Sequence, residues 1–271
     1  MILHRQPRGA LAGFVKLLWH GETAPGAAGV EHALPSGAMH VVLRLWGPEV
    51  RIYSRRGVME PGYALVCGAR SEYYVKDTGP AFCSIGAVLQ PGASLALFSA
   101  PGGELAEAHT ALEDLWGREA ELLRERLAGT ADGHVRLRIF EAALLARLKP
   151  VPLHAAVAGA LQMFAGGSDV AAAVKASGYS HRHFNQLFLS AAGLTPKVHC
   201  RVQRFQRILR GMTAGESWAD LAMEAGYSDQ AHFCREFQRM AGATPTEYAR
   251  AQPAFPMHLP RSNSFNTDGR R

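Results

Sequence analysis

The sequence predicts an α+β protein: a small, mostly antiparallel N-terminal barrel or curled sheet with flanking helices, then an all-α domain with two helix-turn-helix motifs joined by a central helix. Three observations predict this class. Short apolar runs broken by Gly and Pro fill residues 14–89, as in strands joined by turns. Apolar residues at helical spacing dominate from residue 112 onward. One pattern of residues occurs twice between residues 168 and 250.

The composition is that of an ordinary globular protein. The 271 residues, 48% hydrophobic and 19% charged, are enough for two domains with real cores. A formal net charge of +6 suits an anionic partner. No apolar run approaches the roughly 20 residues that span a membrane, and residues 1–8 lack the apolar core of a signal peptide. The four cysteines form no Cys-x-x-Cys pair, so we expect a reduced, cytoplasmic chain.

The N-terminal half is expected to be rich in strands up to about residue 110. Turns at Pro35-Ser36-Gly37 and Pro61-Gly62 are among those that separate the expected strands 14–20, 39–46, 50–54, 63–67, 73–76 and 82–89. Aromatic residues recur along these strands and indicate either a ligand pocket or the core of the sheet, two readings that the sequence does not separate. They are Trp19, Trp46, Tyr53, Tyr63, Tyr73, Tyr74 and Phe82.

Helices are expected at 94–98, 112–127 and 135–148. The last two carry leucines at helical spacing, which suit packing on the sheet or pairing with a second subunit. Lys149-Pro150-Val151-Pro152 predicts the domain boundary, because two prolines in four residues stop a helix and favour a linker. We therefore expect a sensory or oligomerisation domain at 1–149, with helices over 111–148, a DNA-binding domain at 150–251, and a disordered tail at 252–271.

The duplicated pattern is regular over both copies. The first copy contains Gly178-Tyr179-Ser180, Phe184, Phe188, Gly193, Thr195 and Pro196, and the second contains Gly226-Tyr227-Ser228, Phe233, Phe237, Gly242, Thr244 and Pro245. From Phe184 onward the offset is 49 positions, whereas Gly178 recurs 48 positions later, so the copies differ by one inserted residue. Each copy reads as a helix stopped by glycine, an N-capping serine and a second helix, which is the order of a helix-turn-helix.

The second helix of each copy presents polar residues outward between two buried phenylalanines. Arginine, glutamine and asparagine match the donors and acceptors of base edges in the major groove. We expect base contacts from Arg182, Asn185, Gln186, Gln230, His232 and Arg235. A polar outer face is also what any amphipathic helix has, so the pattern in one copy alone does not establish DNA binding.

Charge favours the nucleic-acid interpretation. Residues 170–215 contain no Asp or Glu, although ordinary helical surfaces mix both signs. A surface of one sign suits phosphate, which supplies most of the affinity for nucleic acid. Expected phosphate contacts are Ser180, Lys197, Arg201, Arg204, Arg207 and Ser228.

These residues together resemble the DNA-binding domain of AraC/XylS-type bacterial transcription regulators. The resemblance covers roughly Leu153 to Arg250 and is most specific in the second copy, from Ala-Gly-Tyr-Ser-Asp-Gln-Ala-His-Phe to Thr-Pro-Thr-Glu-Tyr. It implies two recognition helices in successive major-groove segments of double-stranded promoter DNA. Ala231 departs from the longer polar side chain that relatives often carry, which puts a contact there in doubt.

The N-terminal half resembles the short domain of one subgroup of these regulators. The resemblance rests on Leu34-Pro35-Ser36-Gly37, residues 86–92 and Leu112-Glu113-Asp114-Leu115-Trp116-Gly117. Such regulators commonly bind a small effector and dimerise through this domain, so a small-molecule effector, a second copy of the chain and RNA polymerase are candidate partners. The resemblance implies no cofactor and names no effector.

Two alternatives remain open at this point. A DNA repair or modification protein would use Cys67 or Cys83 as its reactive thiol, with the helical domain delivering it to DNA; buried structural cysteine is the commoner role. A metal- or ligand-binding module with a degenerate DNA-binding domain would draw on His20, His32 and His40, although their spacing is looser than metal ligands usually show. We expect neither a metal nor an enzyme.

Overall fold

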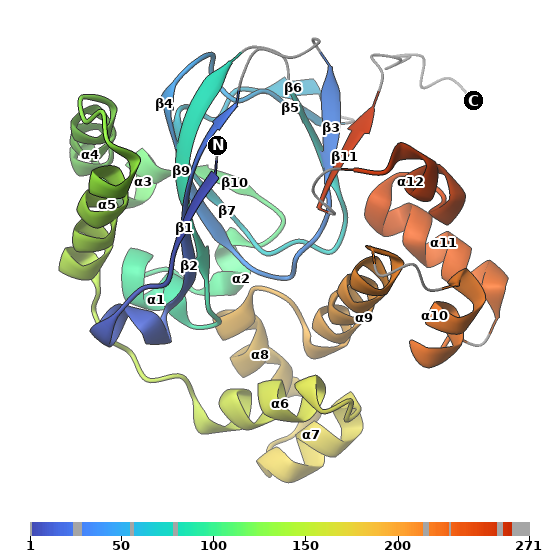
Figure 1. The fold of residues 1–271 in the computed structure, drawn as a ribbon. Coiled ribbons are helices and arrows are strands. Elements are labelled where there is room, and N and C mark those ends of the chain that lie inside the picture. The colour runs from blue at the N-terminus through green and yellow to red at the C-terminus, as the bar shows by residue number, and fades with distance from the viewer. Residues whose placement is uncertain are drawn as a thin grey trace.

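The computed structural model describes residues 2–23, 29–54, 57–77, 81–213, 217–227, 229–253 and 257–261. Two antiparallel sheets face each other in the N-terminal half (Figure 1). The first has the strand order β1 (Ile2–Arg5), β2 (Val15–Thr23), β9 (Phe82–Leu89), β4 (His40–Trp46), β7 (Ala64–Cys67) and β10 (His109–Ala111). The second has the order β11 (His258–Arg261), β3 (Val30–Ala33), β8 (Tyr74–Asp77), β5 (Ile52–Ser54) and β6 (Gly57–Met59). The antiparallel, β-rich prediction is confirmed, and the two sheets do not close into a barrel.

Strand β4 explains how the sheets share their faces. Side chains alternate along a strand, so Val41 and Leu43, both fully buried, join the core that also holds Leu127 of helix α4. His40, Val42 and Arg44 instead point between the two sheets, where they line a cavity. The adjacent valines Val41 and Val42 therefore face different apolar environments, Val41 the core and Val42 the cavity.

Helices cover the outer face of the six-stranded sheet. The short 3-10 helix η1 (Gly9–Gly13) and helices α1 (Ala93–Phe98), α2 (Gly102–Leu105) and α3 (Leu112–Trp116) surround its end, and α4 (Arg118–Ala128) and α5 (Gly133–Arg147) pack on β4 and β2 (Figure 1). Gly117 separates α3 from α4, since its φ of +61° lies outside the helical range. Of the two roles expected for these helices, the structure shows packing on the sheet.

Seven helices make up the C-terminal half among the described residues. They are α6 (Ala155–Ala165), α7 (Val170–Ser177), α8 (His181–Ala192), α9 (Pro196–Thr213), α10 (Trp218–Glu224), α11 (Gln230–Ala241) and α12 (Pro245–Ala251). The first unit, α6 to α8, has its own buried cluster around Phe164, Phe184 and Phe188. The second unit, around Phe205, Phe233 and Phe237, shares one continuous buried cluster with the N-terminal domain. No described helix is both long and apolar enough to cross a membrane.

The chain after α12 corrects one expectation. Residues 252–271 were expected to be disordered, but His258–Arg261 forms β11 and pairs antiparallel with β3, with His258 opposite Ala33. Leu259 is 1% exposed, and Leu34 N–H donates to Met257 C=O at 2.9 Å. A buried leucine, the edge of β3 and an ion pair between His258 and Glu31 at 2.7 Å thus hold a segment whose sequence shows no apolar periodicity. Residues 254–256 and 262–271 lie outside the described residues.

Candidate nucleic-acid interface and interior cavity

The second helices of the two copies, α8 and α11, are built alike. Ser180 caps α8 and accepts a hydrogen bond from the His183 backbone N–H at 3.3 Å. In α11 the cap is Asp229, which accepts from the His232 N–H at 2.7 Å. The expected cap Ser228 lies outside the described residues. The inserted residue explains the change of cap, because Asp229 precedes Phe233 by four positions just as Ser180 precedes Phe184.

The buried face of each helix carries the two repeated phenylalanines. Phe184 and Phe188 are 0% exposed, and Phe233 and Phe237 are 1% exposed. The opposite face carries the expected base-contact residues, of which Arg182, Asn185, Gln186, Gln230 and Arg235 are exposed. His232 is only half-buried, with its ring edge-on to Tyr227 and its Nε2 3.9 Å from a carboxylate oxygen of Glu236. The side chains of these residues are therefore accessible to solvent, and His232 makes the most contacts with the protein itself.

Of the expected phosphate contacts, Ser228 lies outside the described residues, and the other five divide into two groups. Ser180, Lys197 and Arg207 are exposed. Arg201 instead pairs with Glu236 at 3.4 Å, and the guanidinium carbon of Arg204 lies 5.1 Å from the centre of the Tyr227 ring. Tyr227 in turn donates its hydroxyl hydrogen bond to Glu236 at 2.7 Å. These contacts fasten α9 to α11, so two of the arginines already have a structural task.

Sequence reasoning missed several exposed groups on the same faces. His181 and His183 lie in the first turn of α8, and Arg239 lies near the end of α11. His181 lies four residues before Asn185, which places both on one helix face, and this spacing could have identified His181 from the sequence.

The two cysteines of the sheet domain are both buried. Burial raises the pKa of the Cys67 thiol to about 11, and that of the Cys83 thiol to about 11 as well. The Cys83 sulfur lies 3.2 Å from His20 Nε2 and 3.3 Å from Arg136. Even with this neighbour the thiol stays protonated at neutral pH, which does not favour a nucleophilic role.

His20, Glu22 and Cys83 bring three donor atoms within 4.8 Å of one another. The position between them belongs to Arg136, whose guanidinium nitrogen lies 2.9 Å from His20 Nε2 and 3.3 Å from the Glu22 carboxylate. A guanidinium group thus occupies the place that a metal cation would need. His32 and His40 are held elsewhere, His32 by the Ala241 C=O and His40 by the Ser36 hydroxyl.

A cavity of about 510 Å³ lies between the two sheets. Its volume falls within the range of about 300–1,000 Å³ that is typical of small-molecule sites. Trp19, Tyr74 and Phe82 of the predicted aromatic set line it, whereas Trp46 and Tyr63 are exposed. Further lining comes from apolar residues of both sheets and from charged residues of β3, β4 and β8, together with Met257 and His258 at the start of β11: Leu34, Val42, Ile52, Leu65, Val88, Glu31, Arg44, Lys76 and Asp77.

Models of known domain families match most of this chain. A helix-turn-helix domain model matches residues 173–251, and a domain of unknown function, DUF6597, matches residues 3–111. The protein joins an AraC-type helix-turn-helix domain to a DUF6597 domain. It is a DNA-binding transcription regulator, as the duplicated pattern indicated.

Solved structures resemble the chain over most of its length at low identity. The structure of ToxT from Vibrio cholerae in its P21 form is 10% identical, covers 92% of this chain and 98% of its own, and gives a TM-score of 0.46. ToxT bound to an unsaturated fatty acid is also 10% identical, with 85% and 93% coverage and a TM-score of 0.45. No curated protein matches the chain in sequence.

Proposed function

We propose that this regulator recognises a specific DNA sequence with α8 and α11, which enter successive major-groove segments on one face of the duplex. The observation that carries the proposal is the repeated construction of the two helices: each has a capped N-terminus, two buried phenylalanines and an outer face of exposed Arg, Asn and Gln. Exposed Lys197 and Arg207 supply phosphate contacts that set the register, and the outer faces read the bases.

Contacts with the N-terminal domain support a fixed spacing between the two recognition helices. Gly193, which ends α8, packs against Met39 and Ala69, and Gly242, which ends α11, packs against His32 and Tyr73. Both helices are thus held at their C-terminal ends by the sheet domain, while their N-terminal halves face solvent. A rigid spacing suits simultaneous entry into two groove segments.

We further propose that a small effector occupying the cavity between the sheets adjusts this spacing. Met257 and His258, which line the cavity, follow the second helix-turn-helix unit directly in the chain. Gln206 of α9 also donates to the Pro35 C=O at 2.6 Å, and Pro35 lines the same cavity. A molecule in the cavity would therefore contact residues that are linked to α12 through the chain and to α9 through a hydrogen bond.

The experiment begins with selection of bound sequences from random duplex DNA by the purified full-length protein. Fluorescence anisotropy then compares the selected and scrambled duplexes over a salt series. Arg235→Ala and Arg182→Ala should each lose about 1–3 kcal/mol on the selected duplex only, and Lys197→Ala should lower the salt slope by about 1 on both. Arg118→Ala, an exposed arginine on α4, is the matched control and should change nothing. Equal losses on both duplexes for Arg235→Ala would reduce the interaction to non-specific charge attraction.

A further inference from the structure

The charges that line the cavity are not balanced within the protein. Of the lining carboxylates, Glu31 bonds Lys76 at 2.8 Å and His258 at 2.7 Å, and Asp77 accepts the Tyr53 hydroxyl hydrogen bond at 2.6 Å. Two arginines, Arg44 and Arg70, also line the cavity. Among the described residues, neither guanidinium group has a carboxylate oxygen within 4.0 Å, so neither forms an ion pair. Positive charge placed in an apolar enclosure without a partner is unfavourable, and an anionic ligand removes that penalty.

The two arginines differ in how far the protein satisfies them. Arg44 donates to the Ser84 hydroxyl at 3.1 Å and to the Pro48 C=O at 2.9 Å, and its guanidinium carbon lies 4.0 Å from the centre of the Phe82 ring. Those bonds and the stacking fix Arg44 as part of the wall. Arg70 is half-buried and has fewer protein contacts, so it is the better anchor for a ligand.

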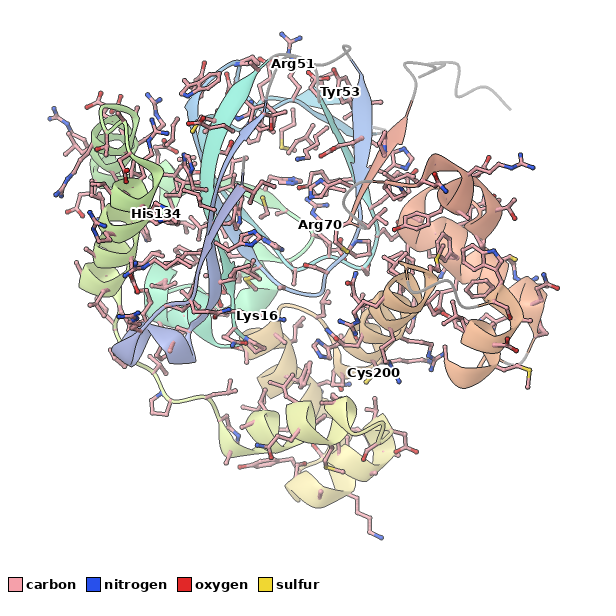
Figure 2. All side chains as sticks on the ribbon, viewed as in Figure 1. Lys16, Arg51, Tyr53, Arg70, His134 and Cys200 are labelled. Atoms are coloured by element: carbon pink, nitrogen blue, oxygen red, sulfur yellow. The ribbon has the colours of Figure 1, made fainter. Side chains whose placement is uncertain are left out.

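Arg70 lies between the two sheets among neutral rings (Figure 2). One of its terminal nitrogens is 2.7 Å from His109 Nδ1, and its guanidinium carbon is 5.0 Å from the centre of the Tyr74 ring. Burial, and after it the positive charges of Arg70 and Lys76, together lower the pKa of His109 to about 3, so that imidazole is neutral at neutral pH. Within the described part of the chain, Arg70 Nε and His109 Nε2 have no hydrogen-bond partner.

Apolar surface continues from this end of the cavity toward the other. His40 of β4 pairs with Cys67, which lies three residues before Arg70 in the chain. Arg44 lies four residues after His40 on the same strand, so the His40 and Arg44 positions are about 13 Å apart. Val42, Leu65 and Val88 line the stretch between them. The cavity thus offers one unsatisfied cation at one end and an apolar wall beside it.

We propose that the ligand of this cavity is a small organic anion with an apolar body, whose anionic head binds the guanidinium group of Arg70. A guanidinium group presents its donors as a planar fork that matches carboxylate, sulfonate or phosphate oxygens. The apolar body lies against Val42, Leu65 and Val88. This inference rests on the effector role proposed above for the same cavity.

Two fluorescent probes with one skeleton test the charge requirement. The first is 8-anilinonaphthalene-1-sulfonate, and the second is N-phenyl-1-naphthylamine, which lacks the sulfonate; both brighten in apolar surroundings. Each is titrated into full-length wild type, Arg70→Gln, Arg70→Lys and Arg51→Gln. Arg51 pairs with Glu60 on the exposed side of β5 and does not line the cavity, so its variant is the matched control (Figure 2).

Arg70→Gln should weaken binding of the sulfonate probe about ten-fold or more, because a hydrogen bond to a charged group is lost. The same variant should leave the neutral probe unchanged, Arg70→Lys should recover part of the sulfonate affinity, and Arg51→Gln should behave as wild type. Val42→Trp, which fills the wall, should weaken both probes and thereby locate them. Equal weakening of both probes by Arg70→Gln, or none of the sulfonate probe, overturns the proposal.

DNA binding by the same variants separates this inference from the proposed function. Arg70→Gln without probe should retain the wild-type preference for the selected duplex, which also shows that the variant is folded. If Arg70→Gln binds the sulfonate probe as tightly as wild type does and keeps the DNA preference, only the proposed ligand class is overturned. If wild type shows no preference for the selected duplex, the proposed function is overturned instead.

Discussion

Gly242 lies at the contact between helix α11 and the sheet domain, and substituting it tests how much that contact contributes to the free energy of unfolding. Its φ is +67°, a conformation that costs a residue with a Cβ about 1–2 kcal/mol. A Cβ at this position would also lie 2.4 Å from the Tyr73 ring and 2.6 Å from His32 Nδ1. Those two rings stack with centroids 4.3 Å apart, and His32 also bonds the Ala241 C=O, so neither ring can retreat easily.

Gly178 isolates the backbone part of this penalty. It ends α7 with a φ of +71°, and an added Cβ would meet nothing within 4 Å. Gly178→Ala should therefore cost about 1–2 kcal/mol, whereas Gly242→Ala should cost that plus about 1–3 kcal/mol of overpacking. At this chain length each kcal/mol lowers Tm by about 2–4 °C.

Urea and thermal unfolding of the two variants and wild type measure the difference. Anisotropy on the selected duplex then reports whether α11 is still correctly placed, and Gly242→Ala should lose more affinity than Gly178→Ala. Combining Gly242→Ala with Tyr73→Ala should recover part of the excess, since the nearest clashing ring is then absent. Equal costs for Gly178→Ala and Gly242→Ala would refute the reasoning, because the close approach of the domains would then carry no energy.

Three further predictions concern the cores and the pH range of stability. Phe184→Ala should lower the free energy of unfolding by about 3–5 kcal/mol in urea and abolish the DNA preference. Burial raises the pKa of Glu31, but hydrogen bonds from His258 and Lys76 outweigh it and lower the pKa from 4.5 to about 2. That ion pair therefore stabilises the fold above about pH 4.5 and is lost as pH falls toward 2, so Glu31→Gln should flatten unfolding free energies measured over this range. Burial lowers the pKa of His199 from 6.5 to about 4, so its neutral form favours the fold above pH 6.5, and His199→Leu should reduce the loss of stability between pH 6.5 and 4.

The sequence predicts best what is encoded locally. The phenylalanines and glycines of the repeat lie within a few residues of the turns and faces that they define, and the structure places them as expected. Asp229 was missed as a cap because the repeat directed attention to the equivalent Ser228, although an aspartate is an equally good cap. Its position four residues before Phe233 was the signal that could have found it.

Contacts between distant segments could not be predicted in the same way. β11 pairs with β3 across more than 220 positions in the chain. The burial of Leu259 depends on that pairing, so the local sequence alone does not predict the strand. The cluster of His20, Cys83 and Arg136 likewise joins β2, β9 and α5. Arg70 and His109 come from the segment after β7 and from β10, and no spacing in the sequence relates them.

The two helix-turn-helix units are joined to the sheet domain unequally, although their sequences are copies. The first unit buries Phe184 and Phe188 in a cluster of its own and meets the sheet domain chiefly where α2 approaches α8. The second unit shares its core with the sheets, and the chain beyond it returns as β11 into the wall of the cavity. Motion of that wall would reach α12 and α11 through the chain itself as well as through packing, whereas α8 meets the sheet domain through packing and through a hydrogen bond from the Gly92 N–H to the Ala191 C=O. A ligand in the cavity would therefore act mainly on the placement of the second recognition helix, and through it on the separation of the two base-reading faces.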